Sequence, residues 1–161
     1  MVLLPCTPMK PSILKTQLYD YCTTYVQERI DSYQKAMKDA QESANSEEKS
    51  SAGDKYETGR AMMQIERDKN AKQLEETIKL KKALSVFSPL QNNTDTVSLG
   101  SVVYTDKGIF YIAISAGKIT LAGETFFAIA PTSPLGLIFI NQKNGTTVVF
   151  NNMPYVIKSI A

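Results

Sequence analysis

The sequence predicts an α+β protein in which a long antiparallel helical hairpin precedes a small antiparallel β domain with one short helix. Apolar residues recur at spacings of three and four in the first half of the chain and alternate with polar residues in the second half. Residues 12–87 hold 13 Lys/Arg and 13 Asp/Glu, whereas residues 88–161 hold four and three. A polar stretch with a proline separates the two halves. We therefore expect an N-terminal tail at 1–11, a coiled-coil hairpin at 12–87, a linker at 88–96 and a β domain at 97–161.

Composition places the chain among ordinary globular proteins, because 43% of its 161 residues are hydrophobic and 21% are charged. No apolar run approaches the roughly 20 residues that a membrane-spanning helix needs. The apolar opening Met1 to Leu4 is interrupted by Pro5 before a secretory core could form. We expect a cytoplasmic protein that has no contact with membranes.

The chain has no histidine and only two cysteines, Cys6 and Cys22. The absence of histidine excludes Ser-His and Cys-His nucleophiles, imidazole acid–base chemistry and the common histidine-based metal sites. Two cysteines are too few for a disulfide framework or a four-ligand zinc site. We expect both to be reduced, small apolar side chains.

The first helix is predicted from about residue 12 to residue 43. Ser12 follows Pro11 and suits an N-cap, and helix-favouring residues end after Ser43. One face of this helix is apolar and the other is charged. The apolar face comprises Leu14, Leu18, Tyr21, Tyr25, Val26, Ile30, Tyr33, Met37 and Ala40.

The second helix is predicted from Asp54 to Phe87, a stretch without proline and with only Gly59 to weaken it. At 1.5 Å per residue, both helices are about 45 to 50 Å long, so they match as partners. The polar connection from Ala44 to Gly53 allows the second helix to fold back antiparallel against the first. Its predicted apolar face comprises Ala61, Met62, Ile65, Ala71, Leu74, Ile78, Leu84 and Phe87.

The C-terminal half is rich in β-branched and aromatic residues, which favour strands. Ser133 and Pro134 are typical of an N-cap followed by the first residue of a helix, so a short helix is expected at Leu135–Ile140. Turns are expected at Asp106–Gly108 and Asn144–Gly145. The predicted strands are Val97–Thr105, Ile109–Ala116, Ile119–Ala122, Thr125–Ala130, Thr146–Asn151 and Tyr155–Ile160.

One pair of acids is placed for chemistry, Asp54 and Glu57 at the turn of the hairpin. From Asp39 to Glu57 there are six acids and two lysines, whereas from Arg67 to Lys82 there are six bases and three acids. The turn is thus acidic and the far end of the hairpin basic. An Asp followed three residues later by Glu is also the pattern of a helix capping box, and Ser51 with Asp54 offers the same pattern one turn earlier. A rigid hairpin that ends in two carboxylates could carry them into the cavity of a partner, where they would bind a divalent cation.

The stretch Gly53-Asp54-Lys55-Tyr56-Glu57, which opens an Ala/Met/Gln/Glu-rich helix, resembles the coiled-coil tip of the bacterial Gre-type transcript cleavage factors. Gly100-Ser101-Val102-Val103 is similar to the first strand of that family's C-terminal domain. Ser133-Pro134-Leu135-Gly136, with Leu137 to Ile140, Gly145 and the closing Tyr155-Val156-Ile157, resembles its short helix and last strands. The resemblance covers most of residues 12–161 in the same order.

The resemblance implies a transcription elongation factor with an FKBP-like C-terminal domain that binds RNA polymerase at the mouth of its secondary channel. The coiled coil would enter the channel, and the polymerase would cleave backtracked RNA. Asp54 and Glu57 would help to hold a magnesium ion that belongs to the polymerase, with Tyr56 and Arg60 supporting the tip. The segment Ser133, Pro134, Leu135 and Gly136 would contribute to polymerase binding. On this basis the chain is a monomeric bacterial accessory factor without a cofactor of its own, and the polymerase remains the enzyme.

The tip departs from the family pattern in having Lys55-Tyr56 and Thr58-Gly59-Arg60 around Glu57. Further departures are Asn141 in place of a common glycine and Thr146 in place of a common Asp. Two alternatives therefore stay open: a polymerase-binding regulator of the same fold that does not support cleavage, and an FKBP-like prolyl isomerase. Direct DNA or RNA binding is less favoured, because the strand-rich half has four lysines and no arginine.

Overall fold

The computed structural model describes residues 10–47, 54–90 and 95–161, with only the backbone described at residues 47 and 54–56. Two long helices, α1 (Pro11–Glu47) and α2 (Asp54–Ser85), precede a six-stranded mixed sheet and one short helix. The α+β class with long N-terminal helices is therefore confirmed. None of the described helices is long and apolar enough to cross a bilayer.

The chain forms two compact units. One comprises Thr24–Lys82, and the other comprises the described residues up to Thr23 together with Ala83–Ala161. Helix α1 thus contributes to both units, and so does α2. The sequence-based boundaries at residues 12 and 88 instead assign both helices wholly to the hairpin.

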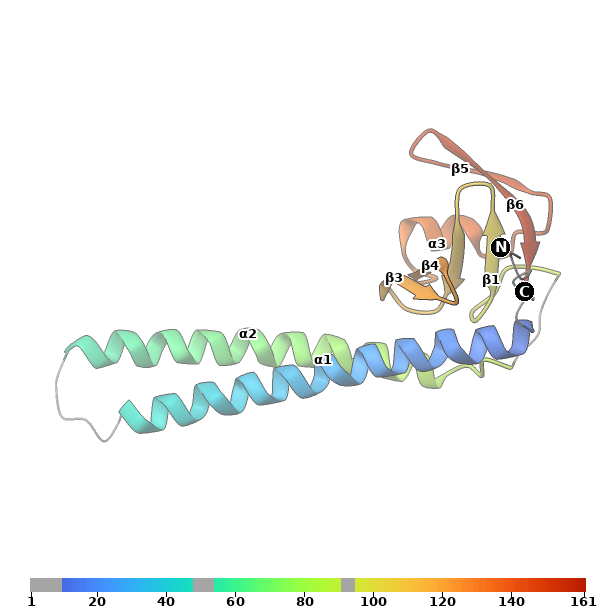
Figure 1. The fold of residues 1–161 in the computed structure, drawn as a ribbon. Helices are drawn as coiled ribbons and strands as arrows, with labels where there is room; N and C mark the ends of the chain where they lie inside the picture. The colour runs from blue at the N-terminus through green and yellow to red at the C-terminus, as the bar shows by residue number, and fades with distance from the viewer. Residues whose placement is uncertain (1–9, 48–53, 91–94) are drawn as a thin grey trace, which may run out of the picture. The chain divides into compact units, whose positions relative to one another are not determined.

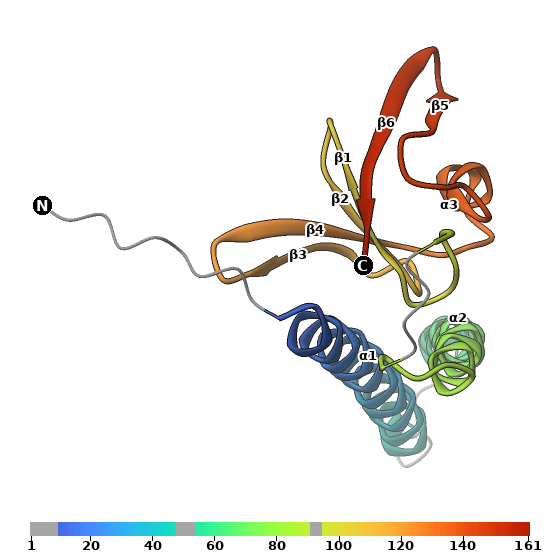
Figure 2. The same cartoon turned by 90° about the vertical axis from the view of Figure 1, so that its right-hand side faces the viewer.

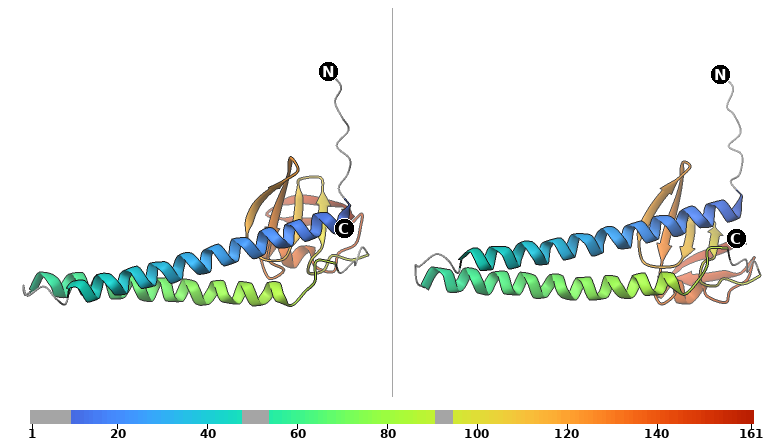
Figure 3. Two further views of the ribbon diagram at one scale, coloured as in Figure 1. Left: turned by 60° about the horizontal axis from the view of Figure 1, so that its bottom comes forward. Right: turned by 90° about the horizontal axis from the view of Figure 1, so that it is seen from below.

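The unit Thr24–Lys82 is an antiparallel helical hairpin (Figures 1 and 3). Lys81 Nζ donates a hydrogen bond of 2.8 Å to Gln27 Oε1, so the end of α2 faces the middle of α1. Nearer the turn, Arg60 and Gln64 line the same hollow as Gln41 and Asn45. The numbers of facing residues therefore rise along α1 while they fall along α2, as antiparallel pairing requires.

The seam of α1 agrees in part with the predicted apolar face, since Val26, Ile30 and Ala40 are buried whereas Tyr21 is 39% exposed. The predicted apolar face of α2 is wrong in part. Met62 is 63% exposed, Ile65 is 68% exposed, and Ile78 also faces solvent. The residues buried on α2 include Asn70 and Thr77, which the hydrophobic pattern did not predict to be buried because both are polar.

A heptad repeat explains which residues of α2 are buried. Met63, Asn70, Thr77 and Leu84 are spaced by seven residues, the period of a coiled-coil seam, and three of these four are buried. Two of the seam positions carry polar side chains. Asn70 Nδ2 donates to the main-chain oxygen of Glu66 at 2.8 Å, and Thr77 Oγ1 donates to that of Gln73 at 2.7 Å. These bonds satisfy the buried polar groups within the helix itself.

Replacing Asn70 by leucine should stabilise the hairpin. The leucine would bury apolar surface at a seam position, and this gain exceeds the net value of the hydrogen bonds that are lost, so the free energy of unfolding should rise by about 1 kcal/mol. Urea unfolding followed by circular dichroism measures the change. Gln64→Leu, at an exposed position of the same helix, is the control and should change stability by less than about 0.5 kcal/mol. A fall in stability with Asn70→Leu would contradict the assignment of Asn70 to the seam.

The sheet is formed by β1 (Val102–Thr105), β2 (Ile109–Ile112), β3 (Gly117–Leu121), β4 (Glu124–Ile129), β5 (Thr147–Phe150) and β6 (Met153–Ile160). Their order in the sheet is β3-β4-β2-β1-β6-β5 (Figure 2). Every predicted strand is present, although the first two are shorter than expected. The chain turns between Ser98 and Ser101, whose main-chain groups are hydrogen bonded, so β1 begins only at Val102.

The sheet is mixed, which corrects the expectation of a fully antiparallel domain. Strands β2 and β4 pair in parallel, with Ile109 opposite Phe126 and Ile112 opposite Ile129. The connection Ala113–Ala116, buried except at Ser115, leads away from β2, so that β3 does not pair with β2. The β3–β4 hairpin then returns β4 to the open edge of β2. Turn signals in the sequence specify hairpin neighbours, but not this insertion.

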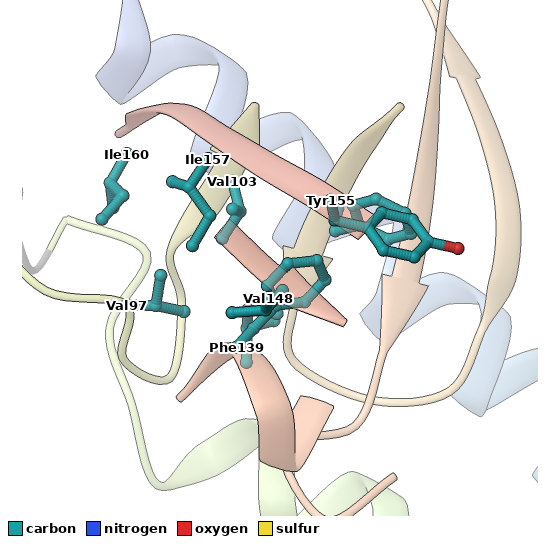
Figure 4. Packing of buried hydrophobic residues seen from close by; sticks show 9 residues of the cluster. Val97, Val103, Phe139, Val148, Tyr155, Ile157 and Ile160 are labelled. Carbon is teal, nitrogen blue, oxygen red and sulfur yellow. The ribbon is translucent and has the colours of Figure 1, made fainter. Parts of the chain in front are cut away.

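The core of the domain lies between one face of the sheet and helix α3 (Pro134–Phe139) (Figure 4). Phe110, Phe139 and Tyr155 form its aromatic centre, with ring centroids 5.2 to 6.1 Å apart. The aliphatic side chains around them are Val97, Val103, Ile112, Val148, Ile157 and Ile160.

Candidate functional site

The predicted tip acids lie at the start of α2. Asp54 is the first helical residue, and Glu57 follows in the same first turn with an exposed side chain. Positions three residues apart on a helix lie on the same face, so the backbone puts residues 54 and 57 on one side of α2. The side chains of Asp54 and Tyr56, and residues Ser51 and Gly53, lie outside the described residues, and so does any capping hydrogen bond they make.

The position of the acids along the hairpin follows from helix geometry. Glu57 and Lys82 are 25 residues apart on the uninterrupted helix α2, which corresponds to about 38 Å. Helix α1 extends to Glu47, so both helices reach the turn that the chain makes between them. The acids therefore lie at the turn end of the hairpin, as predicted.

Arg60, the second predicted tip residue with a described side chain, is exposed one turn after Glu57. It lines a hollow of about 120 Å³ between the two helices, together with Ala40, Gln41, Ala44, Asn45, Met63, Gln64 and Arg67. This hollow contains two arginines and no acid, so its chemistry differs from that of the turn. Within the described part of the chain, no three cysteine or acidic side chains gather closely enough to hold a metal ion.

A feature that the sequence reasoning missed stiffens α1. Arg29 Nη1 donates to the hydroxyl of Tyr25 and Arg29 Nη2 to the hydroxyl of Tyr33, both at 2.8 Å. The guanidinium carbon also lies 5.4 Å and 5.7 Å from the centroids of the two rings. The i, i+4 spacing of the three residues was visible in the sequence, but the tyrosines were assigned to the apolar face alone. The two bonds link three successive turns of the helix.

Cys22 agrees with its predicted role as a small apolar side chain. It is a free thiol and fully buried, and burial raises its pKa to about 12. Because the thiolate is the nucleophilic form, this residue is unreactive at neutral pH. Cys6 lies outside the described residues.

The second predicted site, Ser133-Pro134-Leu135-Gly136, forms the N-terminus of α3. Ser133 is the N-cap: its Oγ accepts a hydrogen bond from Gly136 N at 3.1 Å and donates one to the main-chain oxygen of Ala130 at 2.7 Å. Gly136 is buried, whereas Pro134 is exposed. The next residue, Leu137, is 65% exposed and was not singled out as a site residue. Ser133 and Gly136 therefore build the helix start, and Pro134 with Leu137 forms its surface.

Comparisons of this chain with protein-family models, with curated proteins and with solved structures found no match.

Proposed function

We propose that this protein is an accessory factor of RNA polymerase that inserts its helical hairpin into the secondary channel and stimulates cleavage of backtracked RNA. The observation that carries the proposal is the start of α2 at Asp54, which puts the Asp54–Glu57 pair in the first turn of a long helix at the turn end of an antiparallel hairpin. The order of elements supports it, because hairpin, strands and short helix follow one another as the resemblance to the Gre-type factors implies.

The donor set at the tip suits magnesium. Carboxylate oxygens are hard ligands, and Mg²⁺ in phosphoryl-transfer sites is commonly bound through one or two carboxylates with water and phosphate oxygens completing the shell. Two acids on one helix face can supply only part of such a shell, so the metal would be shared with the polymerase. A magnesium ion bound there would supply activation of water and polarisation of the phosphate. The hairpin's own contribution would be to position Asp54 and Glu57.

A polymerase-binding regulator that does not support cleavage is the second candidate. Arg60 favours it, because an arginine three residues after Glu57 brings positive charge to the same helix face and opposes binding of a divalent cation. Such a factor would occupy the channel and alter initiation or elongation.

Prolyl isomerase activity receives less support. An isomerase needs an open, aromatic-lined pocket for the proline ring. Here Phe110, Phe139 and Tyr155 pack against one another in the core, and Tyr155 is only 9% exposed. A peptide isomerisation assay on the full chain would test this candidate.

Stalled elongation complexes separate the first two candidates. The purified chain is added to backtracked complexes that carry RNA labelled at the 3′ end, in the presence of magnesium, and the release of 3′ fragments is followed with time. Faster release supports a cleavage factor. Binding to the polymerase together with changed transcription and unchanged release supports the regulator. Absence of binding in co-sedimentation would reject both.

The surface of α3 gives a separate test of polymerase binding. Leu137→Ser removes an exposed apolar side chain from the helix that we propose to contact the polymerase, so the dissociation constant should rise about tenfold. Titration of fluorescently labelled protein with polymerase measures it. The thermal midpoint of the free protein should stay unchanged, because the side chain is 65% exposed. The control Val149→Ser, which removes a 60% exposed apolar side chain from β5, should bind like the unmodified chain. Equal weakening by both substitutions would contradict a contact through α3.

A further inference from the structure

Strand β5 is an edge strand whose outer side has no neighbour among the described strands (Figure 2). It pairs only with β6, and the register places Val148 opposite Tyr155 and Val149 opposite Pro154. Proline has no N–H, so it cannot donate to Val149 across this pair. In an antiparallel ladder, residues alternate between hydrogen-bonded and non-hydrogen-bonded pairs. The main-chain groups of Thr147 and Val149 therefore point towards the open edge.

The open edge of β5 carries neither charge nor proline, two features that usually prevent strand addition. No charged residue lies between Asn144 and Ile157, and β5 contains neither lysine nor proline. The opposite edge strand, β3, carries the exposed Lys118. Charges and prolines on an edge strand are two of the means by which natural sheets prevent edge-to-edge pairing. By this criterion β3 is protected and β5 is open.

The outward face of the β5–β6 hairpin is also apolar. Val149 is 60% exposed, and Val156, which shares its face on β6, is 37% exposed. Val149 and Thr147 alternate with the buried Val148, so both point away from the core. A strand added to β5 would extend this face and cover part of it.

We propose that β5 pairs antiparallel with β5 of a second copy of this chain, joining two sheets into one. A two-fold axis at Val148 would place Thr147 of each copy opposite Val149 of the other, where the outward main-chain groups can exchange hydrogen bonds. This register brings β-branched side chains together, which is favourable across strands. β5 itself carries no charged residue, so no like charges meet in this register. Because residues 144–157 carry no charge, a charged strand would find no opposite charge along this edge, and a second copy of the uncharged β5 is the occupant that suits it.

Sedimentation velocity of the full chain from about 1 µM to about 1 mM tests the pairing. The dimer fraction should rise with concentration. Val149→Lys places a charge at the open edge, and Val149→Pro removes its outward N–H while leaving the pair with Pro154 intact. Each substitution should raise the dissociation constant of the dimer about tenfold or more. Val149→Pro removes a main-chain hydrogen bond on each side of the axis, and Val149→Lys puts an unpaired charge on the joined edge of each copy.

The matched control is Thr120→Lys, which puts the same charge on an exposed position of the other edge strand. It should leave the dimer unchanged. Hydrogen exchange adds a site-specific readout, because the amides of Thr147 and Val149 should become slower to exchange as the concentration rises. Self-pairing of β5 does not depend on whether the helical hairpin acts on RNA polymerase. It is overturned if the chain stays monomeric over the whole range, if Thr120→Lys disrupts the dimer equally, or if these amides become protected only when polymerase is added.

Discussion

Combining Asp54→Asn with Glu57→Gln is expected to reduce stimulated RNA cleavage by about 100-fold or more, while polymerase binding changes little. Both substitutions keep the size of the side chain and remove the negative charge that a magnesium ion requires. Loss of a single charge-stabilising group in an active centre typically costs 10²–10³ in rate, so about 100-fold is a conservative expectation for two. The rate of 3′-fragment release at saturating protein gives the effect on the chemical step.

The chain contains a matched control for this pair. Asp39 and Glu42 lie on α1 with the same spacing of three residues, and both are exposed. Lys38 pairs with Glu42 at 3.7 Å, and this ion pair is solvent exposed and contributes little to stability. Asp39→Asn with Glu42→Gln changes the net charge by the same amount, yet it should leave cleavage unchanged. Equal losses in both double variants would indicate a general charge effect and would contradict a role for the tip acids.

Gly136→Ala is expected to destabilise the β domain by about 3 kcal/mol. A Cβ atom at this position would lie 2.0 Å from the main-chain oxygen of Ala130, and the neighbouring Ser133 Oγ would be only 2.9 Å away. The first atom belongs to the backbone and cannot move aside as a flexible side chain would. Overpacking of this severity falls at the upper end of the usual cost of 1–3 kcal/mol, or about 3 kcal/mol. Urea unfolding followed by tyrosine fluorescence measures the change.

Gly145→Ala separates this steric cost from a conformational one. Gly145 has φ of +81°, but nothing lies within 4 Å of an added Cβ, so only the left-handed backbone opposes the substitution, at a cost of roughly 1–2 kcal/mol. Leu137→Ala, at an exposed position of α3, should change stability by less than about 0.5 kcal/mol. A Gly136→Ala protein that is as stable as Gly145→Ala would contradict the close approach to Ala130.

The parts of the fold that local chemistry determines were predictable from the sequence. Proline at the first turn of α3, after a serine that caps it, determines where that helix begins, and the structure has it at Pro134. The two long helices could be predicted because each segment has a charged face and no internal proline, so that few other secondary structures fit it. The position of Asp54 at the start of α2 followed from the same reasoning. In each case the relevant interactions connect residues that are close in sequence.

Features that depend on distant contacts were not predictable. The polar seam residue Asn70 is buried because α1 covers it, and a pattern of hydrophobicity assigns such a residue to the solvent. The same pattern assigns Met62 and Ile65 to the buried face, although both are exposed. Parallel pairing of β2 with β4 joins strands that turn signals do not relate. The bonds from Arg29 to Tyr25 and Tyr33 required the rotamers of all three side chains.

The central position of β1 between β2 and β6 has a consequence for the order of events during synthesis. The hairpin of β1 and β2 can form as soon as those residues emerge, but the other side of β1 has to wait for β6, the last strand in sequence order. Until then Val103 and Phe110 have no Ile157 or Ile160 to pack against, and their apolar surface is open to other chains. Contacts of such wide sequence separation close slowly. The nascent protein therefore passes through a stage in which its long helices can be complete while its sheet is aggregation-prone, and this stage ends only when β6 joins β1.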